Sequence, residues 1–214
     1  MRKQPLITGE YYHIYNRGVD KRKIFLSDKD YFRFLTSMKE FNQVDPIFSL
    51  YWHNQQKRKQ DVGVGHLQKL VEIVCYCLNP NHIHLILKQL IKNGISEFMK
   101  RLGGGYTNYF NHHYKRSGVL FQGKFKSVHI KKNPYLLYLS AYVNRNYFIH
   151  GYGDDSSWPY SSFWDYTGKR NSGICDMNVI LDQFKNKNEY REFAQENALH
   201  LKEKKETEKY LLEQ

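Results

Sequence analysis

Cysteine is scarce in this sequence. The three cysteines are Cys75, Cys77 and Cys175, and no Cys-x-x-Cys pair occurs. An odd count without that spacing argues against a disulfide scaffold or a cysteine zinc site, and it indicates a reducing compartment. Cys75 and Cys77 lie in the apolar run VEIVCYC, so we interpret them as small core residues. Five prolines and fourteen glycines are too few for a fibrous or low-complexity protein.

Long apolar runs are also missing. No stretch approaches the roughly 18 consecutive apolar residues that a membrane helix needs. The opening MRKQPLITGEYYHIYNRG has no apolar core followed by a cleavage-like site, so a secretory signal is not expected. These patterns predict a cytoplasmic protein that has no membrane partner.

Positive charge and aromatic residues are abundant. The 33 lysines and arginines exceed the 21 acidic residues, which gives a net charge of +12. Such a surface attracts polyanions. Aromatic residues make up 16% of the chain, and flat rings interleaved with cations suit the unstacked bases of single-stranded nucleic acid. A basic protein with a tyrosine-rich core is the alternative that composition leaves open.

Apolar periodicity predicts the order strand, helix, strand, strand, helix, strand and a further helix. The first six elements match an α+β fold, a ferredoxin-like split βαβ sandwich with a central antiparallel sheet. We expect a catalytic domain over 1–167 and a helical tail over 168–214. The expected strands lie at 11–18, 71–78, 82–88 and 125–132, and the expected helices at 27–41, 95–118 and 135–148.

Local signals refine these limits. Ser27 is a plausible N-cap with Asp30 three residues on, and Asn133-Pro134 suggests an N-cap followed by a first-turn proline. Gly103–Gly105 interrupt the second helix, and the pattern does not say whether they kink it or break it. The polar stretch 52–68 is expected to be an exposed loop.

The pair His82 and His84 is the main chemical signal. Alternate residues of a strand share a face, so both imidazoles point the same way while Ile83 points into a core. Two imidazoles on one face can chelate a divalent metal. Two polar residues on the wet face of an amphipathic strand are the alternative.

A second signal lies in the last of these helices. Tyr138, Tyr142 and Asn146 fall four residues apart and would share one helical face. Together with the histidine pair they suggest a metal held by His82, His84 and Asn146. Tyr142 would attack a scissile phosphate, giving a 5′-phosphotyrosine and a free 3′ hydroxyl. Alternatively, these tyrosines simply form a buried face of the helix, with Asn146 at its frayed end. If one tyrosine is the nucleophile, Tyr138 is the rival to Tyr142.

The sequence resembles the single-tyrosine His-hydrophobic-His transposases (IS200-like), especially the REP-associated tyrosine transposase branch. The resemblance spans about 11–166 and runs in order through YYHIYNRG, CYCLNPNHIHLIL, SEFMKRLGGGYTNYFN, GVLFQGKFKSVHI, YLLYLSAYVNRNY and WPYSSFWDY. By this resemblance His82 and His84 match the metal ligands, Tyr142 the nucleophile and Asn146 the third ligand.

The resemblance implies a transposase that nicks and joins single-stranded or hairpin DNA, uses Mg²⁺ or Mn²⁺, and works as a monomer or homodimer near the bacterial nucleoid. Two imidazoles would also accept Zn²⁺. The chain departs from the family in three places. These are the triple glycine, the long 52–68 loop and Tyr147, which follows Asn146 where the branch usually has proline. They leave the preferred DNA sequence open.

Several other polar residues are candidates for DNA contact or for structure. We expect His13 and His129 to be structural hydrogen-bonding residues, and His112 and His113 to lie on a helix surface. Basic residues that could contact a DNA hairpin or line a single-strand groove, or simply be solvated, are Arg17, Lys21, Arg22, Lys23, Lys124, Lys126, Lys131 and Lys132.

Three other classes of protein share parts of this pattern. A histidine-triad hydrolase would need a third histidine where Ile86 stands, and relaxases usually bring a larger chain. A catalytically silent DNA- or RNA-binding protein on the same scaffold is the serious alternative. A protein that only binds nucleic acid has no need of a nucleophile together with metal ligands, so the set His82, His84, Tyr142 and Asn146 argues against this alternative.

Overall fold

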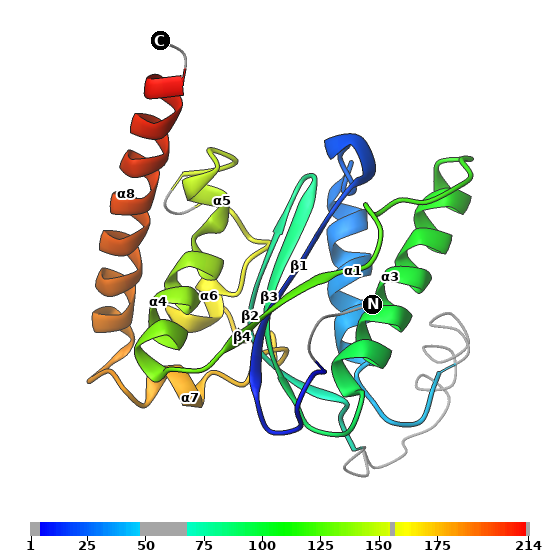
Figure 1. The fold of residues 1–214 in the computed structure, drawn as a ribbon, viewed down its shortest axis with the longest axis horizontal. Coiled ribbons are helices and arrows are strands. Elements are labelled where there is room, and N and C mark those ends of the chain that lie inside the picture. The colour runs from blue at the N-terminus through cyan, green and yellow to red at the C-terminus, as the bar shows by residue number, and fades with distance from the viewer. Residues whose placement is uncertain (1–4, 48–67, 155–156, 213–214) are drawn as a thin grey trace.

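Four antiparallel strands form the sheet of this protein. The computed structural model describes residues 5–47, 68–154 and 157–212 (Figure 1). Within these ranges the strand order is β2-β3-β1-β4, and each neighbouring pair is antiparallel. The predicted order of the first six elements is confirmed. The strands are β1 (Tyr11–Arg17), β2 (Val71–Asn79), β3 (His82–Gln89) and β4 (Lys126–Ile130).

Helices α1 (Asp28–Glu40) and α3 (Gly94–His113) cover one face of the sheet (Figure 1). The predicted cap of α1 is confirmed, because Ser27 and Asp30 form a capping box. Helix α3 runs continuously through the three glycines. Gly105 packs so closely on Phe41 that an added Cβ would lie 2.8 Å from its ring.

The other face is covered by α4 (Asn133–Asn144), α5 (Asn146–Ile149) and α8 (Lys187–Leu212), with the short α6 (Phe163–Tyr166) and α7 (Asn178–Leu181) beneath them. Helix α8 buries Tyr190 and Ala194 in the same apolar cluster as α4. Cys75 and Cys77 are also buried in this cluster, as predicted. No helix in the described ranges is long and apolar enough to cross a membrane.

Two predictions about the helix that carries Tyr142 were wrong. Asn133 is its first helical residue, and Lys132 occupies the cap position. The helix also does not continue to Phe148, because it ends at Asn144. Arg145 leaves the helical region at φ −107° and ψ 12°, and Asn146 begins the separate helix α5. The loop predicted over 52–68 lies almost wholly outside the described residues.

Candidate catalytic and metal-binding site

The two histidines of β3 lie on the sheet face that α4 and α5 cover. Neighbouring β1 places Tyr15 opposite His84 and Arg17 opposite His82. Ile83 points to the other face and packs in the core beneath α1 and α3. The predicted alternation of these side chains is therefore confirmed. Both histidines are buried rather than solvated, with exposed fractions of 5% for His82 and 8% for His84.

The hydrogen bonds of His82 determine its tautomer. Its Nδ1 lies 2.6 Å from Oδ1 of Asn81, an oxygen that only accepts, so Nδ1 carries the proton. Its Nε2 therefore presents a lone pair. That lone pair lies 3.2 Å from Oδ1 of Asn146, a second acceptor. The amide nitrogen of Asn79 donates to both atoms, at 2.9 Å and 2.7 Å.

His84 is held by a third histidine. Its Nδ1 lies 2.8 Å from Nε2 of His13, and the two rings stack at 5.1 Å. When Nδ1 of His84 donates this bond, its Nε2 is left as a lone pair. Burial lowers the pKa of His13 and of His82 to about 4, and it lowers the pKa of His84 well below the usual value. All three rings are neutral at pH 7, the form that binds metals.

Two of these donor atoms are spaced as two ligands of one divalent metal would be. Adjacent ligands that bind a metal at about 2.1 Å lie about 3 Å apart, close to the 3.2 Å between His82 Nε2 and Asn146 Oδ1. Asn146 is fully buried, and its Oδ1 accepts from the Asn79 amide at 2.7 Å, which holds that oxygen beside His82. No group of three His, Cys, Asp or Glu side chains in the described ranges could hold a metal. The amide oxygen is therefore the third protein donor available here.

Tyr142 projects from α4 into the same cavity. Its ring centroid lies 5.7 Å from that of His84 and 6.2 Å from that of His13, edge to face in both cases. The cavity measures about 320 Å³ and is lined by Tyr142 together with both histidines of β3. Tyr138, the rival nucleophile, is not among its lining residues. Burial raises the pKa of Tyr142, and the nearby Asn146 amide opposes that shift.

The predicted basic residues separate into three groups. Arg17 and Lys126 line this cavity, and Lys126 lies over the ring of Tyr15. Lys124 lines a different hollow on the other sheet face. The remaining members are exposed. Lys21 and Lys23 lie in or beside the turn after β1, Arg22 pairs with Asp20, and Lys131 and Lys132 lie beyond the far end of β4.

The other histidines are placed as predicted. His13 and His129 are hydrogen-bonded, the latter to Glu10 at 2.9 Å, while His112 and His113 are exposed on α3. The hydrogen-bond partner of His13, however, is His84, a candidate metal ligand. His13 is therefore part of the candidate site.

Three residues of the site were missed by sequence reasoning. Asn79 bridges His82 and Asn146, although it reads as part of the breaker before Pro80. His150 lines the cavity, with its ring 5.0 Å from that of His82. Lys205 of α8 reaches Nδ1 of His150 at 2.8 Å. The tail therefore contacts the rim of the site, a long-range contact that no motif signalled.

Comparison with known proteins finds one family match that includes the predicted metal ligands and nucleophile. Residues 62–146, which include both histidines, Tyr142 and Asn146, match the family described as "Transposase IS200 like". Over these residues the chain is similar to the IS200-like transposases.

A solved structure described as the REP-associated tyrosine transposase bound to a REP hairpin shares the fold. Its TM-score is 0.50 at 17% sequence identity, over 83% of this chain and 88% of that one. No curated protein matches the chain.

Proposed function

We propose that this protein is an IS200-like transposase, a metal-dependent endonuclease and strand transferase that acts on single-stranded DNA through Tyr142. One observation carries the proposal. The Tyr142 ring lies 5.7 Å from that of His84, in a cavity that both histidines of β3 line. A phenol and neutral metal-binding imidazoles are thus brought together from elements far apart in the sequence.

The metal would be held by Nε2 of His82, Nε2 of His84 and Oδ1 of Asn146, leaving positions for phosphate oxygens. Mg²⁺ or Mn²⁺ suits oxygen-rich coordination by the substrate. When bound, the ion supplies Lewis-acid polarisation of the scissile phosphate. Asn79 would orient the Asn146 amide, and His13 would orient His84.

In the chemical step the Tyr142 oxygen forms a bond to phosphorus, and the bond from phosphorus to the 3′ oxygen breaks. The phenol gives up its proton, and the departing 3′ oxygen takes one up. The product is a 5′-phosphotyrosine and a 3′ hydroxyl. Because the phosphodiester energy is kept in the adduct, another 3′ hydroxyl can reverse the step, which gives strand transfer without a nucleotide cofactor.

The substrate would be a single strand next to a DNA hairpin, and the enzyme a member of the REP-associated branch. The net charge of +12 and the positions of Arg17 and Lys126 in the cavity support a DNA partner. The structurally similar protein is described as bound to a REP hairpin. On this proposal, residues 1–167 form a ferredoxin-like catalytic unit, and 168–214 form a tail that contacts its rim. The enzyme would work as a monomer or homodimer beside the nucleoid.

The test is a nicking assay with pooled, end-labelled hairpin oligonucleotides and Mn²⁺. We expect a denaturation-resistant protein–DNA adduct from the wild type and none from Tyr142→Phe, while Tyr138→Phe behaves as wild type. Tight DNA binding without an adduct from any of the three proteins would favour the catalytically silent binding protein instead.

A further inference from the structure

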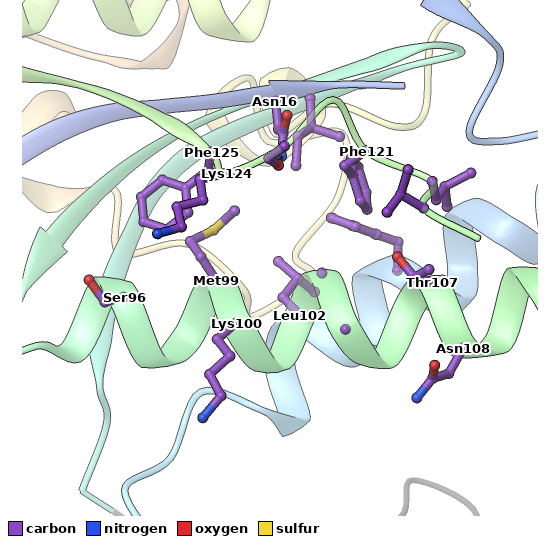
Figure 2. Close-up of a pocket in the computed structure, with 17 residues that line it drawn as sticks. Asn16, Ser96, Met99, Lys100, Leu102, Thr107, Asn108, Phe121, Lys124 and Phe125 are labelled. Carbon is purple, nitrogen blue, oxygen red and sulfur yellow. Dashed lines mark hydrogen bonds between the residues drawn. The ribbon is translucent and has the colours of Figure 1, made fainter. Parts of the chain in front are cut away.

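A large apolar hollow lies on the sheet face opposite the candidate catalytic cavity. It measures about 930 Å³ and separates α3 from the segment 119–125, which leads into β4 (Figure 2). Met99, Leu102 and Thr107 of α3 point toward that segment, and Phe121 points back toward α3 (Figure 2). We call this hollow the α3 groove. Its volume lies within the roughly 300–1,000 Å³ typical of ligand sites.

Two glycines of α3 have no packing role in the described structure. A Cβ at Gly103 or Gly104 would meet no atom of the described residues within 4 Å, whereas one at Gly105 would collide with Phe41. A helix-interior glycine lowers stability relative to alanine. Both open glycines line the α3 groove. Glycine at such a place lets another molecule approach the helix backbone closely.

The α3 groove adjoins the catalytic cavity across a single segment of chain. Gln122 donates its backbone N–H to the carbonyl of Arg17 at 2.7 Å, which ties 119–125 to the end of β1. Gln122 and Lys126 line the catalytic cavity, Lys124 lines the α3 groove, and Asn16 lines both. The two hollows therefore lie on either side of the edge of the sheet.

The lining of the α3 groove suits nucleobases next to a phosphate backbone. Phe121 and Phe125 supply flat rings on which unstacked bases pack. Lys124 and Lys100 are the charged residues of the lining, which includes no carboxylate. Lys100 points away from the gap and lies 3.7 Å from Glu97, so Lys124 is the cation beside the opening.

We propose that the α3 groove is a second DNA subsite, which takes bases of the same single strand that enters the catalytic cavity. The strand crosses the sheet edge at 122–126, with Lys124 beside a backbone phosphate. This inference rests on the proposed DNA substrate but not on cleavage. It assigns a binding role to the glycine pair that the fold itself does not require.

Binding of fluorescently labelled single-stranded DNA, measured in the absence of cleavage, tests the proposal. The probes are oligo-dT strands of 4 to 20 nucleotides without metal, and the readout is fluorescence anisotropy. Gly103→Leu fills the groove from a position where a side chain has room, and Gly103→Ala is its matched control. We expect Gly103→Leu to weaken binding of the long strands about tenfold and to leave the shortest strands unchanged. Gly103→Ala should bind like the wild type.

Equal binding of every length by Gly103→Leu and wild type would overturn the proposal, as would an equal loss at all lengths. A change in sedimentation of Gly103→Leu with unchanged DNA affinity would also overturn it, in favour of a second copy of the chain as the occupant. Melting temperatures no lower than the wild type would confirm that both variants fold.

A second measurement locates the strand directly. Oligo-dT that contains 5-bromodeoxyuridine is photo-crosslinked to the protein, and the modified peptides are mapped. Crosslinks to Phe121, to Phe125 or within α3 support the subsite, even if no nicking is ever detected. Crosslinks confined to the α4 face overturn it, even if the enzyme nicks DNA.

Discussion

The Nε2 atom of His13 lies 2.8 Å from Nδ1 of His84, and their rings stack with an interplanar angle of 17°. His13 comes from β1 and His84 from β3, so the antiparallel register brings them together. A metal-binding histidine usually donates its other ring N–H to a second group, which fixes its tautomer and orientation. His13 is such a group for His84.

Replacing His13 should therefore weaken metal binding. His13→Phe keeps a flat ring but cannot accept the proton of His84, and loss of such a partner typically lowers metal affinity about 10- to 100-fold. Calorimetric titration with Mn²⁺ measures this. The matched control is His129→Phe, because His129 bonds Glu10 rather than a candidate ligand. Equal Mn²⁺ affinity in both variants would show that His13 does not position His84.

Two asparagines two residues apart should have different roles. Asn144 accepts from Ser162 and donates to Tyr190, so Asn144→Ala removes two buried hydrogen bonds and should lower stability by about 1–3 kcal/mol. Asn146→Ala should instead abolish stabilisation by Mn²⁺, which is about 2.7 kcal/mol at 100 times the dissociation constant. Thermal melts with and without Mn²⁺ separate the two effects. A full Mn²⁺ shift in Asn146→Ala would exclude that residue as a ligand.

The ion pair of Asp165 and Arg170 should stabilise the segment that covers β2. Asp165 is 2% exposed and accepts two bonds from Arg170, which also reaches the hydroxyl of Tyr76. Asp165→Ala leaves a partly buried guanidinium without its carboxylate, which should lower the free energy of unfolding by about 3–5 kcal/mol. Urea denaturation of the variant and of the wild type measures this difference in the free energy of unfolding. The exposed Asp182→Ala should change stability by less than about 0.5 kcal/mol, and a similar value for Asp165→Ala would contradict the prediction.

Two lysines of one segment should differ in DNA binding. Lys126 lines the catalytic cavity, whereas Lys131 is five residues further along the chain, about 16 Å at the rise of a strand. Lys126→Ala should weaken single-strand binding and reduce the salt slope by about 1. Lys131→Ala should leave both quantities near wild type. Anisotropy titrations over a range of salt concentrations compare them, and equal slopes would place Lys126 outside the DNA path.

The strands and the facing of the two histidines could be predicted because they depend on local rules. Side chains alternate along a strand, so His82, Ile83 and His84 could be assigned to faces without a structure. The capping box of Ser27 and Asp30 is equally local. The family pattern supplied Tyr142 and Asn146, and the fold brings both toward the histidines.

The rest depends on tertiary contacts that no local pattern encodes. The pairing of His13 with His84 depends on strand register, and the Lys205–His150 contact depends on how α8 packs. The break at Arg145 was missed because its sequence is helix-compatible. There the buried guanidinium packs against Phe148 and Phe163, each ring 4.7 Å away. That packing is set by the folded core rather than by propensity.

The most direct test of the central claim is to find the residue that carries the DNA. Wild-type protein is incubated with hairpin oligonucleotides and Mn²⁺, digested with protease and nuclease, and its peptides are analysed by mass spectrometry. We predict a nucleotide linked through a 5′ phosphate to Tyr142, and its loss when the metal is chelated. A nucleotide linked to Tyr138 or to any other residue would contradict the assignment of Tyr142 as the nucleophile.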